Sequence, residues 1–232
     1  MMAFVTGAAS GIGRAVAERL AVDGYAVVGF DNVIPEGRGD SPVTYVRGDV
    51  SKAVEVDAAI DAAVGVHGAI DVLVTAAGIK RPDAEDGAFE RMLAVNIGGV
   101  MYACNAAVRH MQAVKRGAIV NFGSGSADGD AQSIGYAASK GAVVSLTRSL
   151  AMRLIPDRIS VNCVVPGLTE SGMTTMIPPE LMAQRGERNV SGVPNRPEDV
   201  AETVAFLCSD RARTMSGAIV HVGAHANQGI LR

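Results

Sequence analysis

Short apolar segments alternate with longer amphipathic ones along nearly the whole chain. Several apolar segments are continuous rather than alternating, which is typical of strands buried on both faces of a parallel sheet. The pattern predicts strands at residues 3–6, 25–30, 43–46, 70–74, 118–122, 159–164 and 218–222. Between them, apolar residues recur at helical spacing, which predicts helices at residues 11–23, 52–66, 89–111, 134–155 and 197–208.

This alternation predicts one α/β domain over residues 1–232, a Rossmann-type doubly wound parallel sheet of about seven strands flanked by helices. Single α/β domains often run to about 250 residues, so the length calls for no second domain. Hydrophobic residues make up 48% of the chain, which is ample for one buried core. The least regular stretch, near residues 168–195, is expected to be a substrate loop, because long irregular loops in compact domains are usually functional.

Composition argues against several classes of partner. The formal net charge is −3 and no long basic run occurs, so nucleic acid is not expected as a partner. No apolar run reaches the roughly 18 residues of a membrane span, and Met1–Ser10 lacks the charge of a signal peptide. Scattered cysteines (Cys104, Cys163 and Cys208) predict buried free thiols in a cytoplasmic protein, and the histidines show no metal-ligand spacing, so no metal is expected.

A glycine-rich turn separates the first predicted strand from the first predicted helix. Gly7, Gly11 and Gly13 fall in this turn. A dinucleotide site needs glycines there for a tight turn, for close approach of the backbone to a pyrophosphate, and for packing of the helix on the sheet. The free N–H groups of the helix N-terminus then favour phosphate. Asp31 ends the second strand, where a carboxylate can bond the ribose hydroxyls and repel a 2′-phosphate. Asp31, with Ser10 rather than a basic residue in the turn, predicts NAD over NADP.

Tyr136 and Lys140 lie four residues apart on one predicted helix, and therefore on one face. A nearby ammonium favours the phenolate, which would lower the tyrosine pKa and make the pair an acid/base. Ser124 follows the fifth strand, at the end of the sheet where ligands bind, and Ser126 is a weaker candidate for the same role. Asn96 interrupts a predicted helix, which indicates either a functional break or a solvent-facing residue in an imperfect helix.

Together these motifs resemble the short-chain dehydrogenase/reductase family over essentially the whole chain. The resemblance implies a catalytic tetrad of Asn96, Ser124, Tyr136 and Lys140. It also matches Asp49-Val50 to an adenine contact and Pro166-Gly167 to a loop that meets the nicotinamide. The cofactor-binding residues that we predict are Gly7, Ser10, Gly11, Ile12, Gly13, Asp31, Asp49, Val50, Ala76, Ala77, Gly78, Tyr136, Lys140, Pro166, Gly167, Thr169 and Ser171.

By this resemblance, hydride passes between a secondary alcohol or ketone substrate and nicotinamide C4, with NAD as the cofactor. Tyr136 would be the acid/base, Lys140 would lower its pKa and bond the ribose, Ser124 would orient the substrate oxygen, and Asn96 would hold a water in a proton relay. The alternatives are a catalytically silent NAD-binding sensor or structural homologue, and an enoyl reductase. The enoyl reductase is rejected because Ala142 stands six residues after Tyr136, where its lysine is expected.

The chain departs from the family pattern after the fourth strand. Thr75-Ala76-Ala77-Gly78 stands where the family has Asn-Asn-Ala-Gly, so an amide that ties neighbouring strands is missing. The substrate is not identified by the sequence. Several charged residues on the loops expected around the pocket either recognise a polar substrate or are solvated: Lys80, Arg81, Asp128, Asp130, Glu170, Arg185 and Arg188.

The predicted helices at 89–111 and 134–155 carry Ala and Val on more than one face, which indicates cover on more than one side. One face packs on the sheet, so we expect the other to meet a second subunit. The family resemblance implies a homotetramer, with a homodimer also possible. The alternative is a monomer whose helices are merely rich in alanine. Ala107 is taken as a trial position on the outer face.

Overall fold

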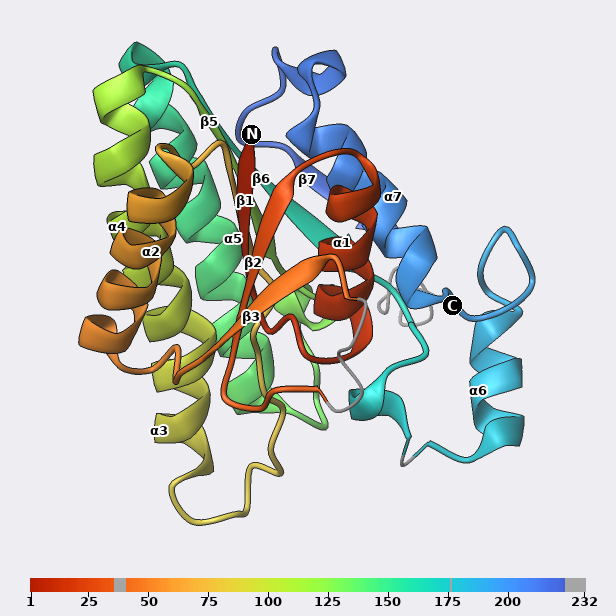
Figure 1. The fold of residues 1–232 in the computed structure, drawn as a ribbon. Coiled ribbons are helices and arrows are strands. Elements are labelled where there is room, and N and C mark those ends of the chain that lie inside the picture. The colour runs from red at the N-terminus through yellow and green to blue at the C-terminus, as the bar shows by residue number, and fades with distance from the viewer. Residues whose placement is uncertain (36–40, 176, 224–232) are drawn as a thin grey trace.

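Seven parallel strands form one sheet in the computed structural model, which describes residues 1–35, 41–175 and 177–223 (Figure 1). The strand order is β3-β2-β1-β4-β5-β6-β7, and every neighbouring pair is parallel. The predicted doubly wound α/β fold is therefore confirmed. The strands are β1 (Met2–Thr6), β2 (Ala26–Asp31), β3 (Val43–Arg47), β4 (Val72–Thr75), β5 (Gly117–Phe122), β6 (Ile159–Pro166) and β7 (Ile219–Val222).

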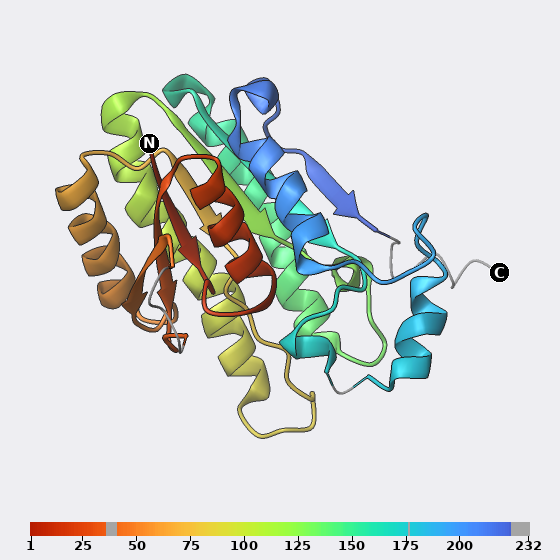
Figure 2. The same ribbon diagram turned by 45° about the vertical axis from the view of Figure 1, so that its right-hand side comes forward.

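Helices cover both faces of the sheet (Figures 1 and 2). Side chains of α2 (Ala53–His67), α4 (Val100–Val114) and α5 (Ile134–Leu154) build the core on one face. Those of α1 (Gly11–Val22) and α7 (Pro197–Cys208) build it on the other. Strand β1 serves both cores: Phe4 faces the first and Val5 the second. This double burial explains why the strand is continuously apolar.

Two predicted segments differ from the structure. The helix expected at 89–111 is divided into α3 (Ala88–Leu93), a π-helical turn (Ala94–Gly99) and α4, so the break expected around Asn96 is confirmed. The stretch near 168–195, expected to be irregular, contains α6 (Pro179–Gly186), which begins with proline at the first helical position. Helix α6 stands away from the sheet at the edge of the molecule (Figure 2).

Burial settles two further expectations. Cys104, Cys163 and Cys208 are buried free thiols, as predicted. Burial raises the pKa of Cys104 and of Cys208 to about 12, so both thiols stay protonated. Ala107, the trial position for the outer face, is fully buried in the core beneath α4 and therefore does not lie on that face. None of the helices in the described part of the chain combines the length and apolar character that a bilayer crossing requires.

Candidate active site

A cavity of about 370 Å³ opens near the carboxyl ends of the central strands. Strands β2 and β4 flank β1 on opposite sides, and this change of strand order is where doubly wound sheets bind ligands. Most of the predicted cofactor residues line the cavity: Gly7, Ser10, Gly11, Ile12, Gly13, Asp31, Asp49, Val50, Ala76, Ala77, Gly78 and Ser171. Residues that were not among the predicted cofactor contacts also line it: Phe30, Asn32, Gly48, Ile79, Val95, Gly172 and Met173.

The other predicted cofactor residues do not line this cavity: Tyr136, Lys140, Pro166, Gly167 and Thr169. Thr169 is nearly buried, and its hydroxyl donates to the Gly167 carbonyl at 3.1 Å. Ser171 approaches the glycine-rich turn from the opposite side, because a Cβ placed on Gly11 would lie 3.5 Å from the Ser171 Cβ. The segment after β6 therefore faces the turn after β1 across the cavity.

Close packing explains the glycines of the turn after β1. Gly7 has a φ of +70°, and a Cβ there would lie 2.6 Å from the Ala77 nitrogen. A Cβ on Gly13 would lie 2.1 Å from the Gly7 carbonyl oxygen, so α1 could not approach the turn with any larger residue. Ser10 precedes α1 without a side-chain cap, and the first turn of α1 carries no acid. The N-terminal N–H groups of α1 can therefore donate hydrogen bonds to an anion in the cavity.

The Asp31 carboxylate is held at the cavity by two backbone N–H groups. Ala9 donates to one carboxylate oxygen at 2.9 Å, and Val33 donates to the other at 3.2 Å. Each oxygen keeps a second acceptor site for a hydroxyl group. Arg47, which the sequence analysis missed, is paired with Asp31 in the β2–β3 register, and its Nε donates to the Asn32 carbonyl at 3.2 Å. Arg47 does not itself line the cavity.

Thr75 on β4 forms a hydrogen bond to β5, although the sequence analysis expected a link between neighbouring strands to be missing here. Its hydroxyl donates to the Asn121 Oδ1 on β5 at 2.8 Å. The Asn121 Nδ2 donates in turn to the Thr147 hydroxyl on α5 at 3.0 Å, and all three residues are buried. Thr75 therefore links β4 to β5 by its hydroxyl, although the amide of the family's asparagine is absent as expected.

Asn96 is fully buried in the π-helical turn, so its alternative interpretation as a solvent-facing residue is wrong. Its Oδ1 accepts from the Ile79 N–H at 2.8 Å, and its Nδ2 donates to the Ile79 carbonyl at 2.9 Å and to the Ser139 hydroxyl at 3.0 Å. Ser139 donates to the Tyr136 carbonyl at 2.7 Å. The side chain of Asn96 thus fixes the loop after β4 to the helix that carries Tyr136.

Tyr136 and Lys140 lie buried on one face of α5. The Lys140 Nζ is 5.9 Å from the centroid of the Tyr136 ring and donates to the Phe122 carbonyl at 2.9 Å. Burial lowers the pKa of Lys140 to about 8. Burial also raises the pKa of Tyr136, the Ser124 hydroxyl lowers it, and the Asp130 carboxylate raises it further. The net pKa shift of Tyr136 is upward, which is opposite to the predicted direction, because desolvation outweighs the stabilising contacts.

Ser124 and Ser126 have separate tasks. The Ser124 Oγ accepts from the Ser126 N–H at 3.2 Å, at the start of a short 3-10 turn (Gly125–Asp128). A hydrogen bond with the Ser124 hydroxyl lowers the pKa of Tyr136 and so opposes the effect of burial. The Ser126 hydroxyl instead donates to the Asp130 carboxylate at 2.9 Å. The arrangement therefore favours Ser124 over Ser126 as the partner of Tyr136.

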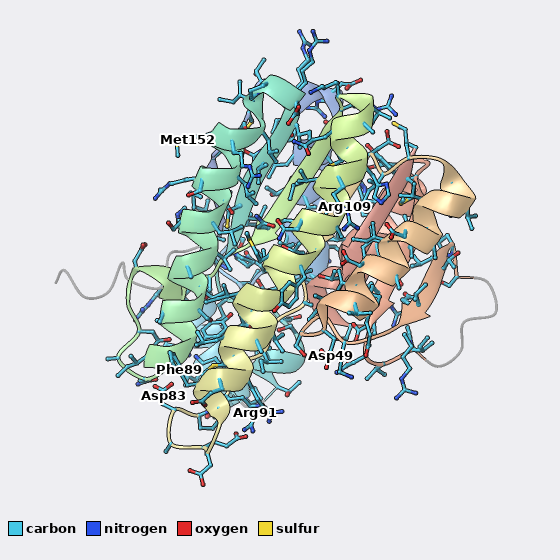
Figure 3. The ribbon with its side chains drawn as sticks, turned by 90° about the vertical axis from the view of Figure 1, so that its left-hand side faces the viewer. Asp49, Asp83, Phe89, Arg91, Arg109 and Met152 are labelled. Atoms are coloured by element: carbon cyan, nitrogen blue, oxygen red, sulfur yellow. The ribbon has the colours of Figure 1, made fainter. Side chains whose placement is uncertain are left out.

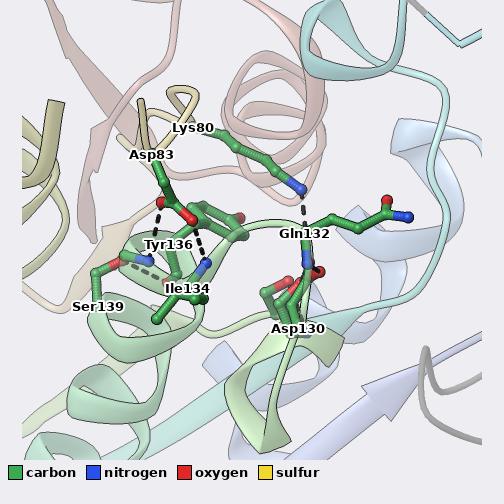
Figure 4. A network of polar contacts seen from close by, with 10 residues as sticks. Lys80, Asp83, Asp130, Gln132, Ile134, Tyr136 and Ser139 are labelled. Atoms are coloured by element: carbon green, nitrogen blue, oxygen red, sulfur yellow. Dashed lines mark hydrogen bonds and ion pairs between the residues drawn. The ribbon is translucent and has the colours of Figure 1, made fainter. Parts of the chain in front are cut away.

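A polar network surrounds Tyr136 on the side of the loop after β4 (Figure 4). Asp83, which the sequence analysis missed, accepts from the Ile134 N–H at 2.7 Å and the Gly135 N–H at 3.1 Å, at the start of α5. The absence of an acid in the first turn of α5 was the signal that its N–H groups needed a distant acceptor. Lys80 reaches across the Tyr136 ring, with its Nζ 5.3 Å from the ring centroid and 3.6 Å from the Asp130 carboxylate.

Comparison with known proteins gives one consistent result. A family model described as enoyl-(acyl carrier protein) reductase matches residues 7–224. Cis-4-hydroxycyclohexanecarboxylate dehydrogenase of Sinomonas cyclohexanicum is 40% identical over 95% of this chain and 94% of its own. The short-chain reductase protein NovJ of Streptomyces niveus is 36% identical over 95% and 92%.

Solved structures agree with these sequence relatives. Thermoplasma acidophilum aldohexose dehydrogenase superimposes with a TM-score of 0.88 at 30% identity, covering 95% of this chain and 91% of its own. ElxO, whose structure has NADP bound, gives a TM-score of 0.87 at 26% identity, covering 95% and 96%. The chain therefore belongs to the short-chain dehydrogenase/reductase family of oxidoreductases.

Proposed function

We propose that this protein is an NAD(H)-dependent oxidoreductase that interconverts a secondary alcohol and a ketone in the cytoplasm. The observation that carries the proposal is the buried phenol of Tyr136, which lies on α5 with Ser124 and Lys140 nearby. Helix α5 lies next to the cavity in which we expect the dinucleotide to bind. A catalytically silent NAD-binding protein is the alternative. The intact set of buried acid/base groups argues against it, because burying Lys140 without a function is costly.

The residues around the cavity fit a dinucleotide. Gly7 and Gly13 leave no room for a Cβ, the N-terminus of α1 is uncapped by side chains, and Asp31 is fixed with acceptor sites to spare. The N-terminus of α1 would bind the pyrophosphate, and Asp31 would bond the ribose hydroxyls. When bound, the nicotinamide supplies the acceptor or donor of hydride.

The protein's own groups handle the proton. Because the pKa of Tyr136 is raised, the residue is a phenol at neutral pH and can donate its proton to a carbonyl oxygen as the carbonyl is reduced. Ser124 would hold that oxygen against the phenol by a second hydrogen bond. Lys140, charged below about pH 8, would stabilise the phenolate that remains. Tyr136 and Lys140 are buried, so water has little access to them.

The substrate of this reaction is a secondary alcohol or ketone rather than an enoyl thioester. The description of the matching family model raises the second possibility. Lys140 four residues after Tyr136, with Ala142 at the sixth, favours carbinol chemistry. The relative from Sinomonas acts, by its name, on a ring that carries both a hydroxyl group and a carboxylate. We therefore propose to screen ring and open-chain ketones, with and without a carboxylate, by following NADH absorbance.

Cofactor choice is tested at Asp31. We predict that the wild-type protein prefers NADH over NADPH, and that Asp31→Ala reduces this preference at least about tenfold, because a carboxylate repels a 2′-phosphate. The ratio of kcat/KM for the two cofactors is the measurement. Arg47 stands next to the site and would attract the 2′-phosphate once Asp31 is gone, so Asp31→Ala combined with Arg47→Gln should lose part of the NADPH gain. A wild-type preference for NADPH would contradict the proposal.

A further inference from the structure

A lysine lies over the ring of the tyrosine to which we assign the acid/base role. The Lys80 Nζ is 5.3 Å from the centroid of the Tyr136 ring (Figure 4). The Lys80 side chain is 43% exposed, so it borders the open side of the site, unlike the buried Lys140 on α5. The Lys80 ammonium therefore lies beside the phenol and remains accessible from outside.

The backbone that carries Lys80 is anchored on both sides. Before it, both the N–H and the carbonyl of Ile79 bond the buried side chain of Asn96. After it, the Asp83 carboxylate accepts from the first N–H groups of α5. The loop is thus held against the helix that carries Tyr136, which keeps the backbone of Lys80 near the phenol.

The partner of Lys80 holds it loosely. The Lys80 Nζ and the Asp130 carboxylate are 3.6 Å apart, beyond the roughly 2.7–3.2 Å of a good hydrogen bond. Asp130 also accepts from the Ser126 hydroxyl at 2.9 Å and the Gln132 N–H at 3.0 Å. Asp130 therefore keeps two donors when Lys80 leaves, whereas Asp130 is the only ion-pair partner of Lys80 within the described ranges. A partly exposed pair of this kind is weak, so another carboxylate can replace Asp130.

We propose that Lys80 binds a carboxylate of the substrate, which takes the place of the Asp130 carboxylate in the ion pair. The preferred substrates are then small hydroxy or keto acids. The inference rests on the proposed function and names the substrate class of the same site. Asp130 then holds Lys80 near the tyrosine while no acid is bound and competes with the acid for it. Lys80 is a specificity residue in this account, and it takes no part in the proton transfer at Tyr136.

The experiment compares keto acids with their methyl esters, which differ only in the negative charge. The probes are 4-oxocyclohexanecarboxylate, 4-oxopentanoate and 3-oxobutanoate, each paired with its methyl ester and reduced with NADH. We expect the wild-type protein to prefer at least one acid over its ester by about ten- to a hundredfold in kcat/KM, the range of a charged hydrogen bond. Lys80→Gln should remove this preference through KM for the acid and leave the ester unchanged.

Three further variants sharpen the test. Lys80→Arg keeps the charge and should retain the preference for acids. Asp130→Asn removes the competing carboxylate and should lower KM for the acid, so the two partners are predicted to act with opposite signs. Arg81→Gln removes the same charge one residue further along an exposed part of the loop and should change neither substrate.

Two kinds of failure are distinguishable. Equal turnover of acids and esters, or turnover of esters alone, would overturn the role of Lys80 and leave the alcohol–ketone proposal intact. A loss with Lys80→Gln that is the same for acid and ester, or that shifts the pH profile of kcat, would also overturn it, since Lys80 would then act on Tyr136. No NADH oxidation with any ketone would instead contradict the proposed function itself.

Discussion

Lys140 is the residue at which function and stability conflict most directly. Its side chain is buried, with one hydrogen bond to the Phe122 carbonyl, and burial lowers its pKa from 10.5 to about 8. Around neutral pH the folded protein must therefore hold a charged ammonium that would be better solvated in the unfolded chain. Under the proposed function this cost is kept because the ammonium would stabilise the Tyr136 phenolate.

This cost predicts a specific pH dependence. Between about pH 8 and pH 10.5 the unfolded chain binds more protons at Lys140 than the folded protein, so the stability of the folded protein rises with pH. Relative to Lys140→Met, the wild-type protein should gain about 2 kcal/mol in the free energy of unfolding between about pH 7.5 and pH 9.5. Urea unfolding of both proteins at the two pH values is the measurement. A difference that does not change with pH would show that Lys140 keeps its proton in the folded protein over this range, so that burial does not lower its pKa.

At the scale of elements, the sequence predicts what depends on local pattern. The seven strands, the glycine-rich turn and the break around Asn96 all follow from apolar runs, from glycines at a strand–helix junction and from poor helix formers. Helix α6 was missed because it is only eight residues long and more polar than the predicted helices, and because it lies within an irregular stretch. Boundaries moved by a few residues, as is usual at helix ends.

Contacts between residues far apart in the chain could not be predicted from the sequence. The bonds of Asp83 to the start of α5 join residues about fifty positions apart, and those of Asn96 to Ile79 cross from a helix to a distant loop. Likewise, no spacing rule showed that Thr75 and Asn121 would together replace a missing asparagine. The direction of the pKa shift of Tyr136 was wrong for the same reason: it depends on burial, which tertiary packing sets.

At the scale of the whole molecule, the outer face of α4 and α5 bears on assembly (Figure 3). Arg109 on α4 forms ion pairs with Asp57 and Asp61 on α2, so α2 covers α4 on that side. Met152 on α5 is instead 69% exposed, and Met101 on α4 is 36% exposed. We propose that a second copy of the chain covers this face and that the protein is a homotetramer.

Light scattering tests the assembly directly. We predict a mass about four times the 23.8 kDa of the chain at micromolar concentration. Met152→Glu adds a charge to an exposed position and should lower the mass without unfolding the chain, whereas Val22→Glu on α1, which is 80% exposed on the other side of the sheet, should not. A dimer would refute the count but keep an interface. A mass near that of one chain would contradict the proposal.

The acid/base role of Tyr136 is the central claim, and Tyr136→Phe tests it most directly. The substitution keeps the buried ring and removes only the hydroxyl that would carry the proton. With the best ketone of the screen, we predict that kcat falls by about a hundred- to ten-thousandfold, the usual contribution of general acid–base catalysis. NADH affinity, followed by the cofactor's fluorescence, should stay within a few-fold of wild type, because the predicted contacts of Asp31 and the glycine-rich turn are intact. Turnover within a few-fold of wild type would contradict the account.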